Sequence, residues 1–165
     1  MAVEIERRFL VDRDISRLCR NGERIVQGYL PTSGQQTVRV RVTESQGYLT
    51  IKGKRQGCSR LEYEWEISPA LAAEVIRDVC DGRVIEKTRY RVRHAGLWWE
   101  IDVFEGANAG LVIAEVELES ADQPVLLPDW VGREITSDRR FSNSTLSRVP
   151  QHPRRLPSTR AVCAA

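Results

Sequence analysis

The sequence contains no long apolar run. Nowhere does it approach the roughly 20 apolar residues that a membrane helix needs, so neither a membrane span nor a membrane partner is expected. The N-terminal segment carries Glu4 where a secretory signal peptide would be apolar, so no signal peptide is predicted. These absences predict a cytoplasmic protein.

Cysteine is scarce and widely spaced. The four cysteines, Cys19, Cys58, Cys80 and Cys163, include no Cys-x-x-Cys pair. This spacing argues against a zinc site and predicts reduced thiols with structural roles.

An excess of one sign of charge is also missing. The 25 Lys and Arg residues nearly balance 23 Asp and Glu residues, which gives a net charge of +2. The molecule as a whole is therefore not an obvious polyanion binder, and no specific nucleic-acid partner is expected. Any electrostatic specialisation must be local.

The length and composition predict one globular domain. At 165 residues with 41% hydrophobic content, the chain can bury a core of its own. We expect this domain to occupy residues 1–148. Residues 149–165 are rich in Pro, Arg, Ser and Ala and are predicted to form a disordered tail.

Alternating apolar residues separated by turn residues predict a chain made mainly of strands. The expected strands are at residues 3–11, 24–30, 37–43, 48–54, 60–67, 83–94, 97–105 and 111–119. The connections are short and resemble those of an antiparallel meander.

Three helical segments are expected, at residues 12–19, from 69 to a point before Gly82, and at 138–148. In the second, Ser68 is a suitable N-cap and Pro69 a suitable first helical residue. The spacing of Leu71, Val75 and Val79 predicts that these side chains share the face that packs against the sheet.

Charged residues recur at every second position of the expected strands. Because alternate side chains of a strand share a face, Glu4, Glu6 and Arg8 point together while Ile5 lies opposite. The same alternation gives basic rows (Arg39 and Arg41; Lys52 and Lys54; Lys87, Arg89, Arg91 and Arg93) and acidic rows (Glu62, Glu64 and Glu66; Glu100 and Asp102; Glu115, Glu117 and Glu119).

Two interpretations of these rows remain open. An ordinary sheet with solvated salt-bridge ladders is one, although it should mix signs to avoid repulsion between neighbours. In the other, the sheet closes into a barrel and the charged faces line its interior. Basic rows then match a polyanion and acidic rows match hard divalent cations, which together describe a metal–polyphosphate site. The outward apolar faces would be covered by helices or by the second subunit of a homodimer.

The N-terminal segment Glu4-Ile5-Glu6-Arg7-Arg8 resembles the Glu-x-Glu-x-Lys signature of the triphosphate tunnel metalloenzymes, or CYTH superfamily. Seven further segments resemble the family in the same order, so that the resemblance spans residues 3–148: Gln27-Gly28-Tyr29-Leu30, Arg39-Val40-Arg41, Thr50-Ile51-Lys52, Glu86-Lys87-Thr88-Arg89-Tyr90, Glu100-Ile101-Asp102-Val103-Phe104, Ala114-Glu115-Val116-Glu117 and Ser137-Asp138-Arg139-Arg140-Phe141-Ser142-Asn143.

The resemblance implies an α+β, mainly β, fold in which about eight antiparallel strands form a closed barrel tunnel covered by a few helices. It also implies a triphosphate-containing small-molecule substrate and a cofactor, Mg²⁺ or Mn²⁺. Short members are most often inorganic triphosphatases, which hydrolyse triphosphate or short polyphosphate to pyrophosphate and phosphate. The alternatives in the family are nucleotide or thiamine triphosphatases and class IV adenylyl cyclases, although we find no residue set dedicated to a base or a thiazolium ring.

Carried over by position, the resemblance assigns the metal to the carboxylates of Glu4, Glu6, Glu115 and Glu117, with Glu119 or Asp102 completing the set. It assigns the phosphates to the cations of Arg39, Arg41, Lys52, Arg89 and Arg91, and less directly to Lys54, which precedes a loop. Eight of these residues should point into one shared cavity: Glu4, Glu6, Arg39, Arg41, Lys52, Arg89, Glu115 and Glu117. Glu62, Glu64 and Glu66 are left open between second-metal ligands and partners of the basic side chains.

Arg8 departs from the signature, which has lysine at this position. Arginine keeps the charge and can clamp phosphate, but it stays protonated and cannot act as a general base. Lys87 is then the better candidate to orient or deprotonate water, because neighbouring cations lower the pKa of a lysine. A second phosphate clamp is the alternative for Lys87, and a non-catalytic polyphosphate binder is the alternative that Arg8 raises for the whole protein.

Aromatic residues are left without a catalytic role. Tyr29 shares a strand face with Gln27 and fits either a tunnel mouth that limits substrate length or an ordinary core position. Trp98 and Trp99 fit the barrel wall or a subunit contact better than stacking on a base.

Overall fold

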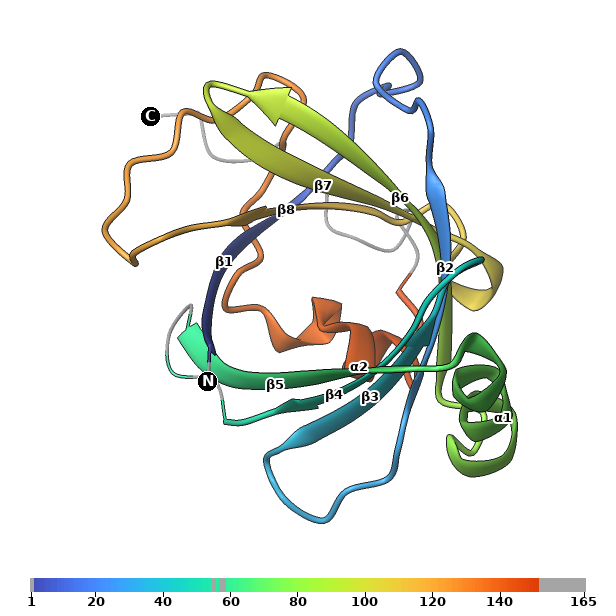
Figure 1. The fold of residues 1–165 in the computed structure, drawn as a ribbon. Coiled ribbons are helices and arrows are strands. Elements are labelled where there is room, and N and C mark those ends of the chain that lie inside the picture. The colour runs from blue at the N-terminus through green and yellow to red at the C-terminus, as the bar shows by residue number, and fades with distance from the viewer. Residues whose placement is uncertain (1, 55, 57–58, 152–165) are drawn as a thin grey trace.

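The computed structural model describes residues 2–54, 56 and 59–151. Within this part of the chain, eight strands form a closed antiparallel barrel in the order β1-β5-β4-β3-β2-β6-β7-β8 (Figure 1). Their bounds are Ala2–Leu10 (β1), Glu23–Tyr29 (β2), Thr37–Val42 (β3), Gly47–Lys52 (β4), Ser59–Ile67 (β5), Val84–His94 (β6), Leu97–Phe104 (β7) and Val112–Glu117 (β8). The predicted fold class is confirmed, and each strand lies close to its expected position.

The first strand closes the barrel by pairing with two others. Its first half, from Ala2 to Ile5, pairs with β5, and its second half, from Glu6 to Leu10, pairs with β8. The charged face of β1 therefore lies between β5 and β8.

The barrel has a polar interior, and its apolar core lies on the outside of the wall. Trp99 of β7 is fully buried against Phe9 and Trp130, with ring centroids 5.6 Å apart in each pair. Its neighbour Trp98 points the other way and is 59% exposed. This outer core is covered by the segments around Ile15 and from 118 to 131.

Helix α1 (Pro69–Val79) covers the outer face of β2, β3 and β4. Ser68 caps it, because its hydroxyl accepts a hydrogen bond from the backbone N–H of Leu71 at 3.2 Å. The predicted packing face is wrong in detail: Ala72 and Ile76 are buried, whereas Leu71 and Val79 are each close to half exposed.

The reason lies in the sheet beneath the helix. A Cβ atom at Gly47 would lie only 3.0 Å from Cβ of Ala72, and one at Gly28 would lie 2.5 Å from the sulfur of Cys80. The two glycines admit the helix at close range along its small residues. The face of closest approach is therefore centred on Ala72 and not on the largest apolar residues.

Residues 12–19 do not form the expected helix. The Asp14 carboxylate accepts a hydrogen bond from the backbone N–H of Ser16 at 2.9 Å, and the N–H groups of Leu18 and Cys19 both reach the carbonyl of Ile15. The segment is thus a single turn that anchors the buried Ile15 in the outer core. One turn is too short to offset the cost of helix nucleation, and the competing Asp14 contact favours the turn.

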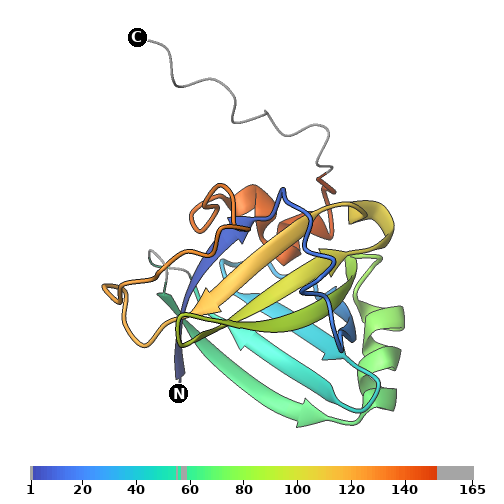
Figure 2. The same ribbon diagram turned by 90° about the horizontal axis from the view of Figure 1, so that it is seen from above.

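The C-terminal part of the domain lies across one end of the barrel (Figures 1 and 2). It contains two short helices, η2 (Arg139–Phe141) and α2 (Asn143–Leu146), where the sequence predicted a last short helical segment. We call residues 136–146 the C-terminal cap. Phe141 and Leu146 are fully buried against Tyr29, Phe104 and other residues at this end of the barrel.

Three predicted features fall partly or wholly outside the described residues. At the start of the predicted tail, the backbone N–H of Gln151 donates to the Asn108 side chain at 3.1 Å. The rest of the predicted tail, and Cys58 and Cys163, are not described. Cys19 and Cys80 are free thiols, and the described helices include none that is long and apolar enough to cross a membrane.

Candidate active site

A cavity of about 700 Å³ occupies the interior of the barrel. It is lined by thirteen of the charged residues singled out from the sequence: Glu4, Glu6, Arg8, Arg39, Arg41, Lys52, Glu62, Glu64, Arg89, Arg91, Glu100, Glu115 and Glu117. The inward placement of the charged strand faces is therefore confirmed, and the alternative of a solvated outer face is excluded.

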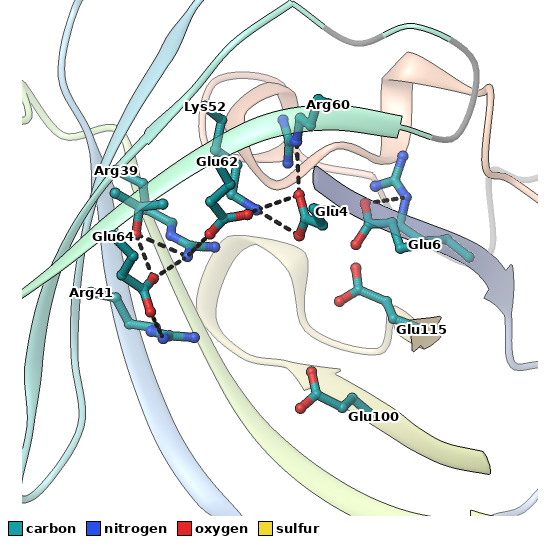
Figure 3. Close-up of polar contacts among 12 residues, drawn as sticks. Glu4, Glu6, Arg39, Arg41, Lys52, Arg60, Glu62, Glu64, Glu100 and Glu115 are labelled. Carbon is teal, nitrogen blue, oxygen red and sulfur yellow. Dashed lines mark hydrogen bonds and ion pairs between the residues drawn. The ribbon is translucent and has the colours of Figure 1, made fainter. Parts of the chain in front are cut away.

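One side of the cavity is a set of cations that are each held by carboxylates. We call it the paired wall: Arg39, Arg41, Lys52 and Arg60 with Glu4, Glu62 and Glu64 (Figure 3). Lys52 Nζ lies 2.8 Å from Glu4 Oε1 and 2.7 Å from Glu62 Oε2. Burial alone would raise the pKa of Glu4, but Lys52 and Arg60 outweigh it and hold that pKa far below its usual value.

Two arginines of the paired wall share one acid. Arg39 and Arg41 both contact Glu64, at 3.2 and 3.4 Å. The Thr50 hydroxyl donates a hydrogen bond to the same carboxylate at 2.7 Å and fixes its position. In the described structure Glu62 and Glu64 are therefore partners of the basic side chains, one of the two roles left open by the sequence, and Glu66 is exposed and does not line the cavity.

A fully buried ionic bridge lies beneath the cavity surface. Asp102 accepts hydrogen bonds from Lys87 and, in a two-point contact at 2.7 and 2.8 Å, from Arg89. Arg89 also contacts Glu115 at 3.0 Å and Glu100. Burial would raise the pKa of Asp102, but Arg89 and Lys87 outweigh burial and lower it strongly. The Asp102 carboxylate is thus engaged by two cations and does not line the cavity.

Lys87 does not line the cavity either. It is 1% exposed, and its ammonium group lies against Asp102 and 5.7 Å from the ring centre of Phe104. Burial and the nearby Arg89 lower its pKa, against the opposing effect of Asp102 and Glu115. The direction agrees with the expectation from the sequence, but burial is the larger cause.

The other side of the cavity is acidic. We call Glu6, Glu115 and Glu117 the acidic corner; Glu6 and Glu115 point into the same space in Figure 3, near Glu100. Burial and the neighbouring Glu6 and Asp102 raise the pKa of Glu115, and burial together with Glu4, Glu100 and Glu6 raises that of Glu117. At Glu115 and Glu117, the nearby cations do not offset burial and the repulsion of other carboxylates.

The chemistry of the acidic corner fits Mg²⁺ or Mn²⁺, because hard divalent cations prefer carboxylate oxygens. Within the part of the chain that the structure describes, however, no three His, Cys, Asp or Glu residues already stand in positions that could hold a metal ion. The donors are present at one side of the cavity, and they would have to converge to bind an ion.

Arg8 is buried at the capped end of the cavity, with 4% of its surface exposed. Its Nη1 donates to the carbonyl of Phe141 at 3.1 Å and its Nη2 to that of Thr136 at 3.4 Å. Nε has no hydrogen-bond partner and lies 3.7 Å from Glu6 Oε1. Two of the donors of Arg8, one on each terminal nitrogen, are thus directed to the cap.

Three further residues expected at the site lie at its edge or outside it. The Arg91 side chain is 70% exposed at the cavity wall and pairs with Glu100. Lys54 is exposed beyond the end of β4 and lines a separate, smaller hollow with Arg60. Glu119 is exposed and does not line the cavity.

The sequence reasoning missed several residues that line the cavity. Arg60 was not assigned a role, although it alternates with Glu62 and Glu64 on β5 and that alternation was a usable signal. Ser142, Asn143 and Ser144 of the cap also line the cavity, and no strand pattern could have placed them there.

The aromatic residues take mixed positions. The Tyr29 hydroxyl lines the cavity and accepts a hydrogen bond from Gln27 Nε2 at 2.7 Å, yet the residue is buried among core residues near the cap. Burial raises the pKa of its phenol well above the usual value. Trp98 lines the cavity at its uncapped end, where Arg93 lies 6.0 Å from its ring centre.

A closed antiparallel barrel with an ionic interior, cations facing carboxylates across one cavity, defines a tunnel protein suited to a charged ligand. The sequence pattern of the CYTH domain matches residues 2–151, and the chain belongs to this family.

Curated relatives share most of the chain. The inorganic triphosphatase of Acetivibrio thermocellus is 45% identical over 91% of this chain and 96% of its own length. That of Nitrosomonas europaea is 36% identical over 87% of this chain and 96% of its own length. The crystal structure of the inorganic triphosphatase NE1496 is similar with a TM-score of 0.66 and 32% identity, and the match covers 92% of this chain and 99% of that one.

Proposed function

We propose that this protein hydrolyses inorganic triphosphate to pyrophosphate and phosphate in the barrel cavity, with Mg²⁺ or Mn²⁺ as cofactor. The observation that carries the proposal is the division of one cavity into a paired wall of cations and an acidic corner. The names and high coverage of the relatives support the same substrate.

Substrate binding would use cations that are now paired. Arg39, Arg41 and Lys52 face the cavity with carboxylate partners at 2.7–3.7 Å. Phosphate oxygens can replace those carboxylates as partners of the cations, so the cations stay paired, and the displaced carboxylates then need another partner. Arg89, fixed by Asp102, presents its outer edge to the cavity, and Arg91 adds a solvent-exposed contact.

The acidic corner is the proposed metal site, with Glu6, Glu115 and Glu117 as ligands. Glu4 joins them only by releasing Lys52 and Arg60, which the arrival of phosphate on those cations would permit. A bound divalent ion would neutralise phosphate charge and polarise the scissile phosphoryl group. In the reaction, a water oxygen attacks the terminal phosphorus in line, the bridging P–O bond breaks, and pyrophosphate leaves.

The attacking water must also give up a proton. Arg8 cannot serve as a base. Lys87 has a lowered pKa but directs its ammonium group to Asp102 beneath the cavity surface. This placement supports a role in which Lys87 fixes Asp102, and Asp102 in turn fixes Arg89 for substrate.

The test is a phosphate-release panel with triphosphate, pyrophosphate, ATP and thiamine triphosphate, each with Mg²⁺, Mn²⁺ or a chelator. We expect triphosphate with a divalent ion to be hydrolysed much faster than the other substrates, and the chelator to abolish release. Cyclic AMP as the main product from ATP would assign the protein to the cyclases. Tight triphosphate binding without any phosphate release would make it a polyphosphate binder.

Cytoplasmic location and assembly remain predictions from the sequence. Tyr63 and Trp65 of β5, which are among the residues lining the cavity, stack with ring centroids 6.3 Å apart and are 41% and 50% exposed. A homodimer would cover such residues, and light scattering at several protein concentrations would detect it.

A further inference from the structure

The segment that carries the C-terminal cap is attached to the barrel along β1. The N–H of Leu10 donates to the carbonyl of Arg133 at 2.9 Å, and the N–H of Ile135 donates to the carbonyl of Arg8 at 2.8 Å. The N–H of Arg8 in turn reaches the Thr136 hydroxyl at 3.0 Å. Backbone contacts thus fix the chain as far as Thr136, where it leaves the strand.

Beyond Thr136 the chain turns across the end of the barrel, and there the Arg8 side chain holds it by hydrogen bonds. Its two terminal nitrogens donate to the carbonyls of Thr136 and Phe141. These carbonyls lie at the two ends of the turn that contains η2. One planar guanidinium therefore spans the turn and fixes its shape.

The residues that follow Phe141 line the cavity. Ser142, Asn143 and Ser144 continue directly from the carbonyl that Arg8 holds, and they stand at the end of the cavity opposite Trp98. The position of these three polar side chains thus depends on where Arg8 holds the Phe141 carbonyl.

We propose that Arg8 is a positioning residue that holds the C-terminal cap in register, so that Ser142, Asn143 and Ser144 form the substrate-binding end of the cavity. The expected kinetic effects rest on the proposed function, whereas the structural role of Arg8 in the cap does not. A lysine cannot replace it, because a single ammonium group on a flexible stem cannot bridge two separate carbonyls as the fixed fork of arginine does. The lysine of the family signature and the arginine of this chain are therefore not equivalent.

The test compares three purified variants of the full chain. Arg8→Lys keeps the charge and removes the fork. Thr136→Val removes the hydroxyl that anchors the cap to β1, and Thr136 does not line the cavity. Arg24→Lys is the matched control, since Arg24 makes an exposed pair with Glu86 on the outer surface.

The first measurement is hydrogen exchange, which needs no activity. In Arg8→Lys and Thr136→Val, amides in residues 135–147 should exchange roughly five- to tenfold faster, the effect of losing about one hydrogen bond. Exchange elsewhere in the barrel, and throughout Arg24→Lys, should match that of the unmodified protein.

The second measurement is steady-state kinetics with triphosphate. In Arg8→Lys and Thr136→Val, KM should rise by about three- to tenfold while kcat changes by less than about twofold. The reason is that the cap would contact the substrate equally in the ground state and the transition state. A role limited to overall stability would lower the active fraction without changing KM.

Two results would overturn the proposal. One is unchanged exchange of residues 135–147 in Arg8→Lys. The other is a KM that rises in Arg8→Lys but not in Thr136→Val, which would mean that Arg8 contacts the substrate directly. If the unmodified protein does not hydrolyse triphosphate, the proposed function fails, and the exchange measurement still decides whether Arg8 holds the cap.

Discussion

Glu4 and Glu117 lie in the same cavity, yet their surroundings shift their pKa values in opposite directions. Glu4 belongs to the paired wall, where Lys52 and Arg60 overcome burial and lower its pKa. Glu117 belongs to the acidic corner, where burial and other carboxylates raise its pKa. The paired wall is neutralised by the protein itself, whereas the acidic corner leaves negative charge for a ligand to neutralise.

The difference shows how one cavity can prepare for two ligands of opposite charge. Cations that already have carboxylate partners stay paired when phosphate takes the place of those partners. Carboxylates that repel one another gain when a cation arrives, so the repulsion present without metal adds to the affinity for metal. The two sides can be tested separately.

The largest expected effect is in the acidic corner. Glu117→Gln removes one carboxylate, so divalent-dependent hydrolysis of triphosphate should fall by at least about 10³-fold, the scale of losing an electrostatic contribution to catalysis. Thermal unfolding without metal should be unchanged or shifted upward, because a repulsive charge is lost. Glu119→Gln is the control, since Glu119 is exposed outside the cavity. Full activity of Glu117→Gln would remove Glu117 from the site.

The next effect concerns the paired wall. Lys52 is 5% exposed and contacts both Glu4 and Glu62. Lys52→Met should lower the free energy of unfolding by about 3 kcal/mol, because removing one partner of a buried pair leaves the other uncompensated. Denaturant unfolding measures the change. The control is Lys54→Met, two residues further along the chain, which should leave the free energy of unfolding almost unchanged because Lys54 is exposed. Equal stability of the two variants would contradict the description of the paired wall.

A smaller effect is expected where a cation of the cavity is solvated. The Arg91 side chain is 70% exposed and pairs with Glu100. Arg91→Gln should change stability by less than about 1 kcal/mol and KM for triphosphate by less than about threefold, since exposed ion pairs contribute little. A loss of unfolding free energy as large as that of Lys52→Met would show that the difference in exposure does not determine how much each cation contributes.

The smallest effect is a pH dependence of stability that arises in the cap, away from the paired wall and the acidic corner. Asp138 caps η2 and accepts hydrogen bonds from Arg140, and these contacts with the nearby Arg133 lower its pKa to about 2. A lowered pKa stabilises the fold above the ordinary value of 3.8 and loses that contribution as the pH falls through about 2. The difference in melting temperature between the unmodified protein and Asp138→Asn should therefore be constant above that ordinary value and shrink in acid. A difference that does not change with pH would exclude the charge as its source.

The alternation of side chains made most of the fold predictable. A two-residue period needs only local information, so the eight strands and the shared faces of their charged residues follow from the sequence. The period left open whether those faces point inward, and the family resemblance supplied that direction for Glu4, Arg39 and Glu115. The expected strands at 83–94 and 97–105 leave two residues between them, and in the structure Ala95 and Gly96 adopt positive φ angles, 49° and 85°, that suit a tight turn.

What the sequence did not reveal depends on contacts between distant segments. Whether Glu64 holds an arginine or a metal is decided by Thr50 and Arg39 on neighbouring strands. Lys87 looked like any member of a basic row until Asp102 and Phe104 were placed around it. The face of α1 was set by two glycines in the sheet, and the end of the cavity by a cap whose residues follow no strand pattern.

The double pairing of β1 also governs when the site can form. Leu10 pairs with Ile113, more than 100 residues further along the chain. Contacts over such a distance must wait until the intervening chain has collapsed, and folds with many of them fold slowly. During translation, the strand that carries Glu4 and Glu6 emerges before any of its partners.

Until β8 and the cap have been synthesised, the charged face of β1 has no opposite wall and its outer apolar residues have no cover. Such a segment is exposed to non-native pairing and to chaperones during this interval. Until β8 and the cap are in place, the cavity therefore lacks Glu115, Glu117 and the cap residues that line it.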